Sequence, residues 1–71
     1  MYYKATIQQG PILTTLVIKC SPALLTPLNA ALYEDGGYYR ITQEKMRELL
    51  TNYKLTLEPI QPATEIQQLL D

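Results

Sequence analysis

Hydrophobic and polar side chains between residues 36 and 60 follow a pattern that predicts a strand, a helix and a second strand. In the first strand, Tyr39 and Ile41 share one face. Tyr38 and Arg40 share the opposite face, because successive side chains of a strand point in opposite directions. This stretch has the clearest pattern in the chain, so the remaining elements are expected to pack around it.

The helix at the centre of this stretch is amphipathic. Its apolar side chains recur at intervals of three and four residues, so they lie along one stripe of the helix. These side chains are Met46, Leu49, Leu50 and Tyr53. Thr42 suits the N-cap position, since its hydroxyl can accept a hydrogen bond from the first turn. Asn52 suits the end of the helix, because asparagine tolerates the left-handed conformation often found there.

The strand after the helix has Leu55 and Leu57 on one face and closes at Pro59. A strand, a helix and a strand joined by such short links predict a crossover between parallel strands. We therefore expect the helix to cover a sheet that contains both strands.

The first twenty residues predict an antiparallel β-hairpin with a turn at Gly10-Pro11. Residues 12–20 are rich in β-branched side chains, which favour a strand. Because this strand is apolar on both faces, we expect it inside the sheet rather than at an edge. The side chains that share one face of each strand are Tyr3, Ala5 and Ile7, and Leu16, Ile18 and Cys20.

Residues 27–34 predict a short helix of about two turns. Thr26 and Pro27 suit the N-cap and the first helical position, where the N–H that proline lacks would be unpaired in any case. The double glycine after Asp35 ends the helix. Its apolar stripe consists of Leu28, Ala31 and Leu32.

Apolar side chains at helical spacing also occur near the end of the sequence. They are Ile66, Leu69 and Leu70. A helix this short is stable only if it docks, either on its own sheet or on a partner protein. We therefore expect residues 1–60 to form one domain and residues 61–71 to form an amphipathic tail helix.

The elements follow the order strand, strand, helix, strand, helix, strand, helix. Mixed strands and helices of this kind predict the α+β class. We expect a small mixed sheet of about four strands, with the helices mainly on one face.

Composition excludes several classes of function. The formal net charge of −1 is spread evenly, which gives no electrostatic footprint for nucleic acid or an anionic membrane. The chain has no histidine and only one cysteine, so the commonest general base and the usual zinc site are missing. We expect no enzyme activity, no cofactor and no metal site. The lone thiol and the lack of a long apolar run favour a cytoplasmic location.

Cys20 is the only side chain with nucleophilic potential. Its neighbour Lys19 points to the opposite face of the strand, so this cation would not activate the thiol. A structural role as a small buried side chain is favoured.

All six aromatic residues are tyrosines. If the strands that begin near Tyr2 and Tyr38 are neighbours, these two rings stand side by side on the outer face, near Lys4 and Arg40. Tyrosine and arginine are common at the energetic centres of protein interfaces, although tyrosines across strands also stabilise a sheet by pairing. The predicted partner-binding residues are Tyr2, Lys4, Tyr38, Arg40, Ile66, Leu69 and Leu70.

The sequence favours a small non-catalytic regulator, inhibitor or adaptor that binds another protein, of the kind found among antitoxins or in mobile elements. Self-association into a homodimer is also expected, because a small core gains from covering an open sheet edge. The alternative is a module that binds single-stranded nucleic acid through surface tyrosine, arginine and lysine.

Overall fold

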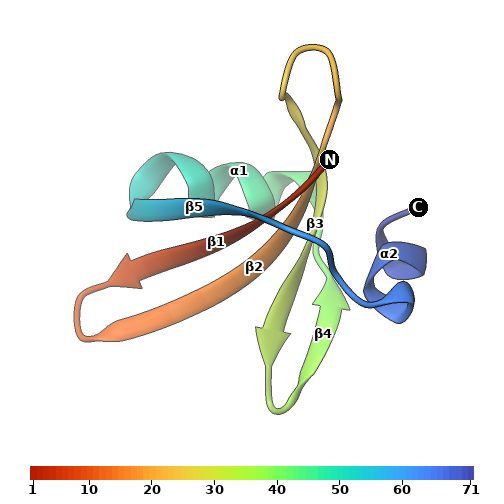
Figure 1. Cartoon of the computed structure of the whole chain (residues 1–71). Coiled ribbons are helices and arrows are strands. Elements are labelled where there is room, and N and C mark those ends of the chain that lie inside the picture. Colours follow the sequence, from red (N-terminus) through yellow and green to blue (C-terminus); the bar gives the residue numbers. More distant parts are fainter.

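Five strands form one antiparallel sheet in the order β4-β3-β2-β1-β5 (Figure 1). The computed structural model describes residues 1–71. The strands are β1 (Tyr2–Gln9), β2 (Ile12–Cys20), β3 (Pro27–Glu34), β4 (Gly37–Arg40) and β5 (Lys54–Ile60). Two helices, α1 (Gln43–Asn52) and α2 (Thr64–Leu70), follow β4 and β5 respectively. The α+β class is therefore confirmed.

Tight turns fix the register of both hairpins. Between β1 and β2, Gly10 adopts a φ of 61° and the proline ring holds Pro11 at a negative φ, which is the combination of a type II′ turn. Between β3 and β4, Asp35 and Gly36 have φ values of 54° and 81°, which suits a type I′ turn. Both turn types match the twist of the strands that they join, so each turn sets the register of its own hairpin.

Helix α1 connects the two edges of the sheet. Thr42 is its N-cap, as predicted, and the Thr42 hydroxyl accepts a hydrogen bond from the Lys45 backbone N–H at 3.1 Å. The helix runs from β4 at one edge to β5 at the other. These strands are not neighbours, because β3, β2 and β1 lie between them. Every neighbouring pair is antiparallel, so the four pairings between β4 and β5 leave these two strands parallel to each other, as the predicted crossover requires, although they do not pair directly.

The stripe of α1 is buried at its centre and exposed at its end. Met46 and Leu49 are buried, and Leu50 packs at the margin of the core. Tyr53 is 38% exposed, contrary to the prediction that it faces inward. Its backbone is already extended, with φ −130° and ψ 158°, so it no longer follows the helical periodicity. The helix ends at Asn52 without a left-handed residue there.

The segment predicted as a helix over residues 27–34 is the strand β3. It lies between β2 and β4 and pairs with both. Its consecutive residues Ala30 and Ala31 are fully buried, one on each face of the sheet. The helical prediction failed because backbone pairing on two sides outweighs a local start signal. Pro27 stands at the first position of the strand, which proline tolerates.

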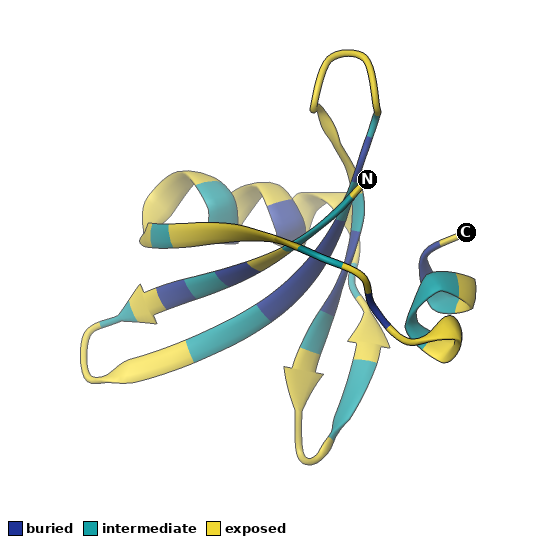
Figure 2. Cartoon of the chain, in the orientation of Figure 1, coloured by how far each residue is buried: buried dark blue, intermediate teal, exposed yellow.

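The sheet buries apolar side chains on both faces. Figure 2 shows that the buried positions gather in the central strands, with others in α1 and at the end of α2. Helix α1 covers one face, where the larger core cluster consists of Ala5, Ile7, Leu16, Ile18, Cys20, Ala30, Met46 and Leu49. Helix α2 covers the other, where Val17, Ala31 and Leu70 form a second cluster. The expected layout, a mixed sheet of about four strands with three helices mainly on one face, is thus corrected to five antiparallel strands between two helices.

Replacing Leu49 with alanine should lower the free energy of unfolding by about 2–5 kcal/mol, because it leaves a cavity in the larger cluster. Urea denaturation followed by circular dichroism measures the change. Glu48→Ala, at an exposed position of the same helix, is the matched control and should change stability by less than about 0.5 kcal/mol. Equal effects of the two substitutions would contradict the packing of α1.

Candidate functional site

The predicted tail helix is docked on its own sheet. Leu70 is fully buried against Val17 and Ala31. The Asn29 side-chain amide donates a hydrogen bond to the Leu70 carbonyl oxygen at 2.6 Å. Ile66 and Leu69 complete the packing. The apolar face of α2 is therefore occupied by the chain itself.

An ion pair adds to this contact. Lys19 Nζ lies 3.0 Å from Asp71 Oδ1, directly beyond the end of α2. The hydrogen bond to Asp71 raises the pKa of Lys19 above its usual value. Because both side chains are accessible to water, this ion pair orients the segment more than it stabilises it.

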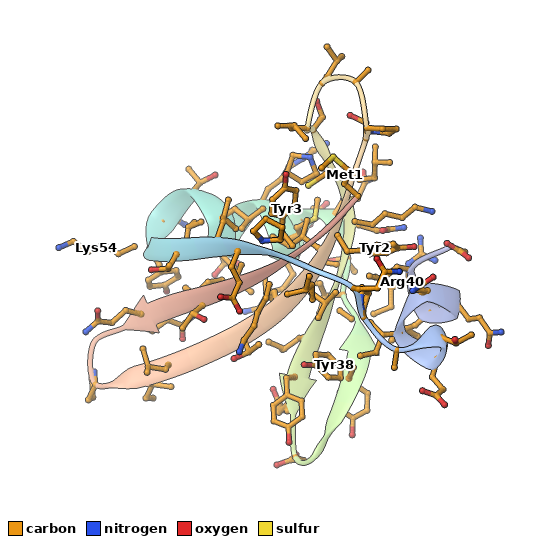
Figure 3. The ribbon with its side chains drawn as sticks, viewed as in Figure 1. Met1, Tyr2, Tyr3, Tyr38, Arg40 and Lys54 are labelled. Carbon is orange, nitrogen blue, oxygen red and sulfur yellow. The ribbon has the colours of Figure 1, made fainter.

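The four remaining predicted binding residues lie on the α2 face but do not form one group. Tyr2 and Lys4 belong to β1, whereas Tyr38 and Arg40 belong to β4, and β2 and β3 separate the two strands. Tyr2 and Tyr38 are accordingly well apart in Figure 3. Both rings pack at the margin of the cluster beneath α2. The neighbour of Tyr38 is Tyr33, with ring centroids 5.0 Å apart.

Cys20 lies in the core on the α1 face and is 7% exposed. Burial raises the pKa of its thiol, which disfavours the thiolate. Lys19 points to the opposite face, as the strand alternation predicted. No group of three or more histidine, cysteine, aspartate or glutamate side chains is placed to hold a metal ion.

An apolar groove of about 330 Å³ opens on the α1 face. Seven of its eight lining residues are hydrophobic, and none carries a charge. Leu50 of α1 forms one side, and Leu55 and Leu57 of β5 form another. The groove exists because α1 lies nearest to β3, which leaves the β5 side of this face without a cover.

The loop between β2 and β3 forms one end of the groove. Ser21 closes it through three hydrogen bonds: its N–H to the Thr26 carbonyl at 2.9 Å, its carbonyl from the Leu25 N–H at 3.0 Å, and its hydroxyl from the Thr26 N–H at 3.1 Å. Leu25 reaches the groove, whereas Leu24 extends into solvent and is 81% exposed. Leu28, the second residue of β3, is also exposed. We call Leu24, Leu25 and Leu28 the leucine surface, and the loop that carries the first two stands at the top of Figure 1.

Leu25 adopts a left-handed backbone conformation with φ 54°. Side chains other than glycine rarely adopt this conformation, which costs free energy. The loop therefore holds a leucine at a position where glycine would be easier to accommodate.

The local pattern predicts a helix that contains Leu28 and does not identify residues 21–25 as a surface. The available signal was the presence of Leu24 and Leu25 between Pro22 and Pro27, since a solvent-exposed turn rarely contains adjacent leucines. That signal identifies unusual exposure, but not the groove, which depends on the distant strand β5.

Neither helix has the length and apolar character needed to cross a membrane. Comparison with protein-family models, curated proteins and solved structures finds no match to the chain.

The buried thiol of Cys20 should react slowly with a disulfide reagent such as DTNB. At pH 8 we expect at least a roughly tenfold slower reaction in the native protein than in urea, because burial restricts access and raises the thiol pKa. Absorbance of the released thiolate measures the rate. A native thiol that reacts as fast as the unfolded one would show that Cys20 is accessible and would reopen a reactive role.

Proposed function

We propose that the chain is a small non-catalytic protein-binding domain, a regulator, inhibitor or adaptor, which contacts its partner through the leucine surface. The observation that carries the proposal is the display of Leu24 on a loop braced by three hydrogen bonds. Apolar side chains exposed together mark interaction surfaces in soluble proteins. A braced loop also loses little conformational freedom on binding, which favours affinity.

The backbone conformation of Leu25 supports the same proposal. Strained backbone conformations persist in proteins where the surrounding structure enforces them, and such positions cluster at functional sites. Here the Ser21–Thr26 hydrogen bonds enforce it, and the result is a leucine side chain directed into the groove. Function would explain why leucine occupies a position that suits glycine.

The adjoining groove indicates the chemistry of the partner. Its lining offers almost no polar surface and no charge, so it would accept apolar side chains and reject charged ones. A partner segment with a few apolar anchors, amphipathic rather than strongly charged, fits this surface best.

The α2 face is a weaker candidate for this role. Its predicted contacts Ile66, Leu69 and Leu70 already pack on the chain's own sheet. Among the other predicted residues only Lys4 and Arg40 are exposed rather than half-buried, and they lie on separate strands.

Replacing Leu24 with aspartate should abolish partner binding while leaving the fold intact, because this side chain has few contacts in the free protein. The measurement is quantitative affinity capture from the native source, with wild type and variant compared by mass spectrometry. Leu13→Asp is the matched control, since Leu13 is 67% exposed at the far β1–β2 hairpin. We expect at least a roughly tenfold loss of the captured protein for Leu24→Asp alone. Equal capture by both variants would contradict the proposal.

Binding to single-stranded nucleic acid is the competing outcome. It would use Tyr33, Tyr38 and Arg40 on the α2 face, and its affinity for an oligonucleotide would fall steeply with salt. Fluorescence anisotropy between about 50 and 200 mM salt measures this directly. Salt-sensitive binding that Leu24→Asp leaves unchanged would replace the protein-binding proposal.

Leu25→Gly should weaken partner binding without a large change in the free energy of unfolding. Glycine removes the cost of the left-handed backbone but adds freedom to the unfolded chain, so we expect stability to change by less than about 1 kcal/mol. Capture of the partner should fall, because the side chain at the groove is lost. Thermal unfolding and the capture assay measure the two effects. A large loss of stability with full binding would assign Leu25 a structural role instead.

A further inference from the structure

Strand β5 presents an unpaired edge whose chemistry can be deduced from the register. The two-residue turn makes Gln9 and Ile12 a hydrogen-bonded pair at one end of β1. At the other end, the Cys20 N–H donates to the Met1 carbonyl at 2.8 Å. The backbone groups of the odd-numbered β1 residues therefore form hydrogen bonds with β2. Those of the even-numbered residues form hydrogen bonds with β5.

The partners of those even-numbered residues occupy alternate positions of β5. They are Lys54, Thr56, Glu58 and Ile60. The backbone groups of Leu55, Leu57 and Pro59 consequently point away from the sheet. Pro59 agrees with this assignment, because proline within a strand is tolerated where its missing N–H faces outward. Leu55 and Leu57 are left with free N–H and C=O groups.

We propose that two copies of the chain dimerise by antiparallel pairing of their β5 edges about a two-fold axis at Thr56. In this register Leu55 of each copy lies opposite Leu57 of the other, and each such pair exchanges two backbone hydrogen bonds. The five-stranded sheets then form one continuous sheet of ten strands. This inference does not depend on the proposed function.

Charge complementarity selects this register. Centring the pair on Thr56 places Lys54 of each copy opposite Glu58 of the other on the α2 face, which gives two attractive cross-strand pairs. Centring on Leu57 instead would place Pro59 in a hydrogen-bonded position without a donor. Centring on Leu55 would place Glu58 opposite Asn52, which belongs to α1.

The same register covers apolar surface on the α1 face. Leu57 is 52% exposed in the single chain and lines the groove together with Leu55. In the dimer the four leucines contact one another between the two grooves.

The two edge strands of the sheet differ in length. Strand β4 has only four residues, whereas β5 has seven and offers the longer edge for pairing with a second copy.

Sedimentation equilibrium over micromolar to millimolar concentrations tests the dimer. We expect the mass to rise with concentration toward twice the 8.1 kDa of the chain. A constant monomer mass would overturn the proposal. Leu24→Asp should dimerise like wild type, so failure of the dimer and failure of the leucine surface are independent results.

Charge-swap variants test the pairing of Lys54 with Glu58. Lys54→Glu and Glu58→Lys should each weaken self-association by roughly tenfold, because like charges then face each other twice. An equimolar mixture of the two variants should regain dimerisation, since each cation again faces a carboxylate. A mixture that associates no better than the separate variants would overturn the register.

Disulfide crosslinking tests the position of the axis. In a Cys20→Ala background, Thr56→Cys places two thiols directly opposite each other across the interface, at a separation of about 4.5 Å between Cα atoms that suits a disulfide. Gln8→Cys is the matched control, because it lies on the same face but one strand further from the axis. Rapid oxidation to a covalent dimer is expected for Thr56→Cys only. Equal or slower crosslinking than the control would overturn the Thr56-centred dimer.

Discussion

Burial of β2 and β3 on both faces is the constraint that shapes this molecule. Adjacent residues of these strands are buried on opposite sides, as Leu16 and Val17 are in β2 and Ala30 and Ala31 are in β3. A sheet with two apolar faces must be covered twice, because either face left open would lose the free energy gained by burial. Helix α1 supplies one cover and α2 supplies the other.

The two helices cover their faces of the sheet to different extents, and this difference leaves the candidate functional surfaces exposed. Helix α2 is short but tightly fixed, through the buried Leu70 and the Asn29 hydrogen bond to its carbonyl. Helix α1 has to span the sheet from β4 to β5, yet it lies nearest to β3. The part of this face that α1 leaves uncovered is the groove, which is bounded by Leu25 of the loop and by leucines of β5. Proposed partner binding and proposed self-association therefore use neighbouring parts of one incompletely covered face.

Local patterns predicted the elements whose geometry is set within a few residues. The N-cap at Thr42, the alternation in β1 and β2 and the turn at Gly10 all depend on nearby backbone chemistry. The prediction of a helix for residues 27–34 failed although Thr26 and Pro27 formed a reasonable start signal. A start signal contributes about 1 kcal/mol, which is less than a central strand gains from two sets of backbone pairs and two buried faces.

The sequence by itself determined the class, the first hairpin, the helix α1 and the absence of histidine and of a second cysteine, because these follow from composition and short-range periodicity. Only the tertiary structure decided the strand order, the separation of Tyr2 from Tyr38, the docking of α2 and the groove beside β5. Each of these depends on which distant segments become neighbours. Which segments become neighbours depends on the burial and strand pairing of the whole chain taken together, so it cannot be read from any single stretch of sequence.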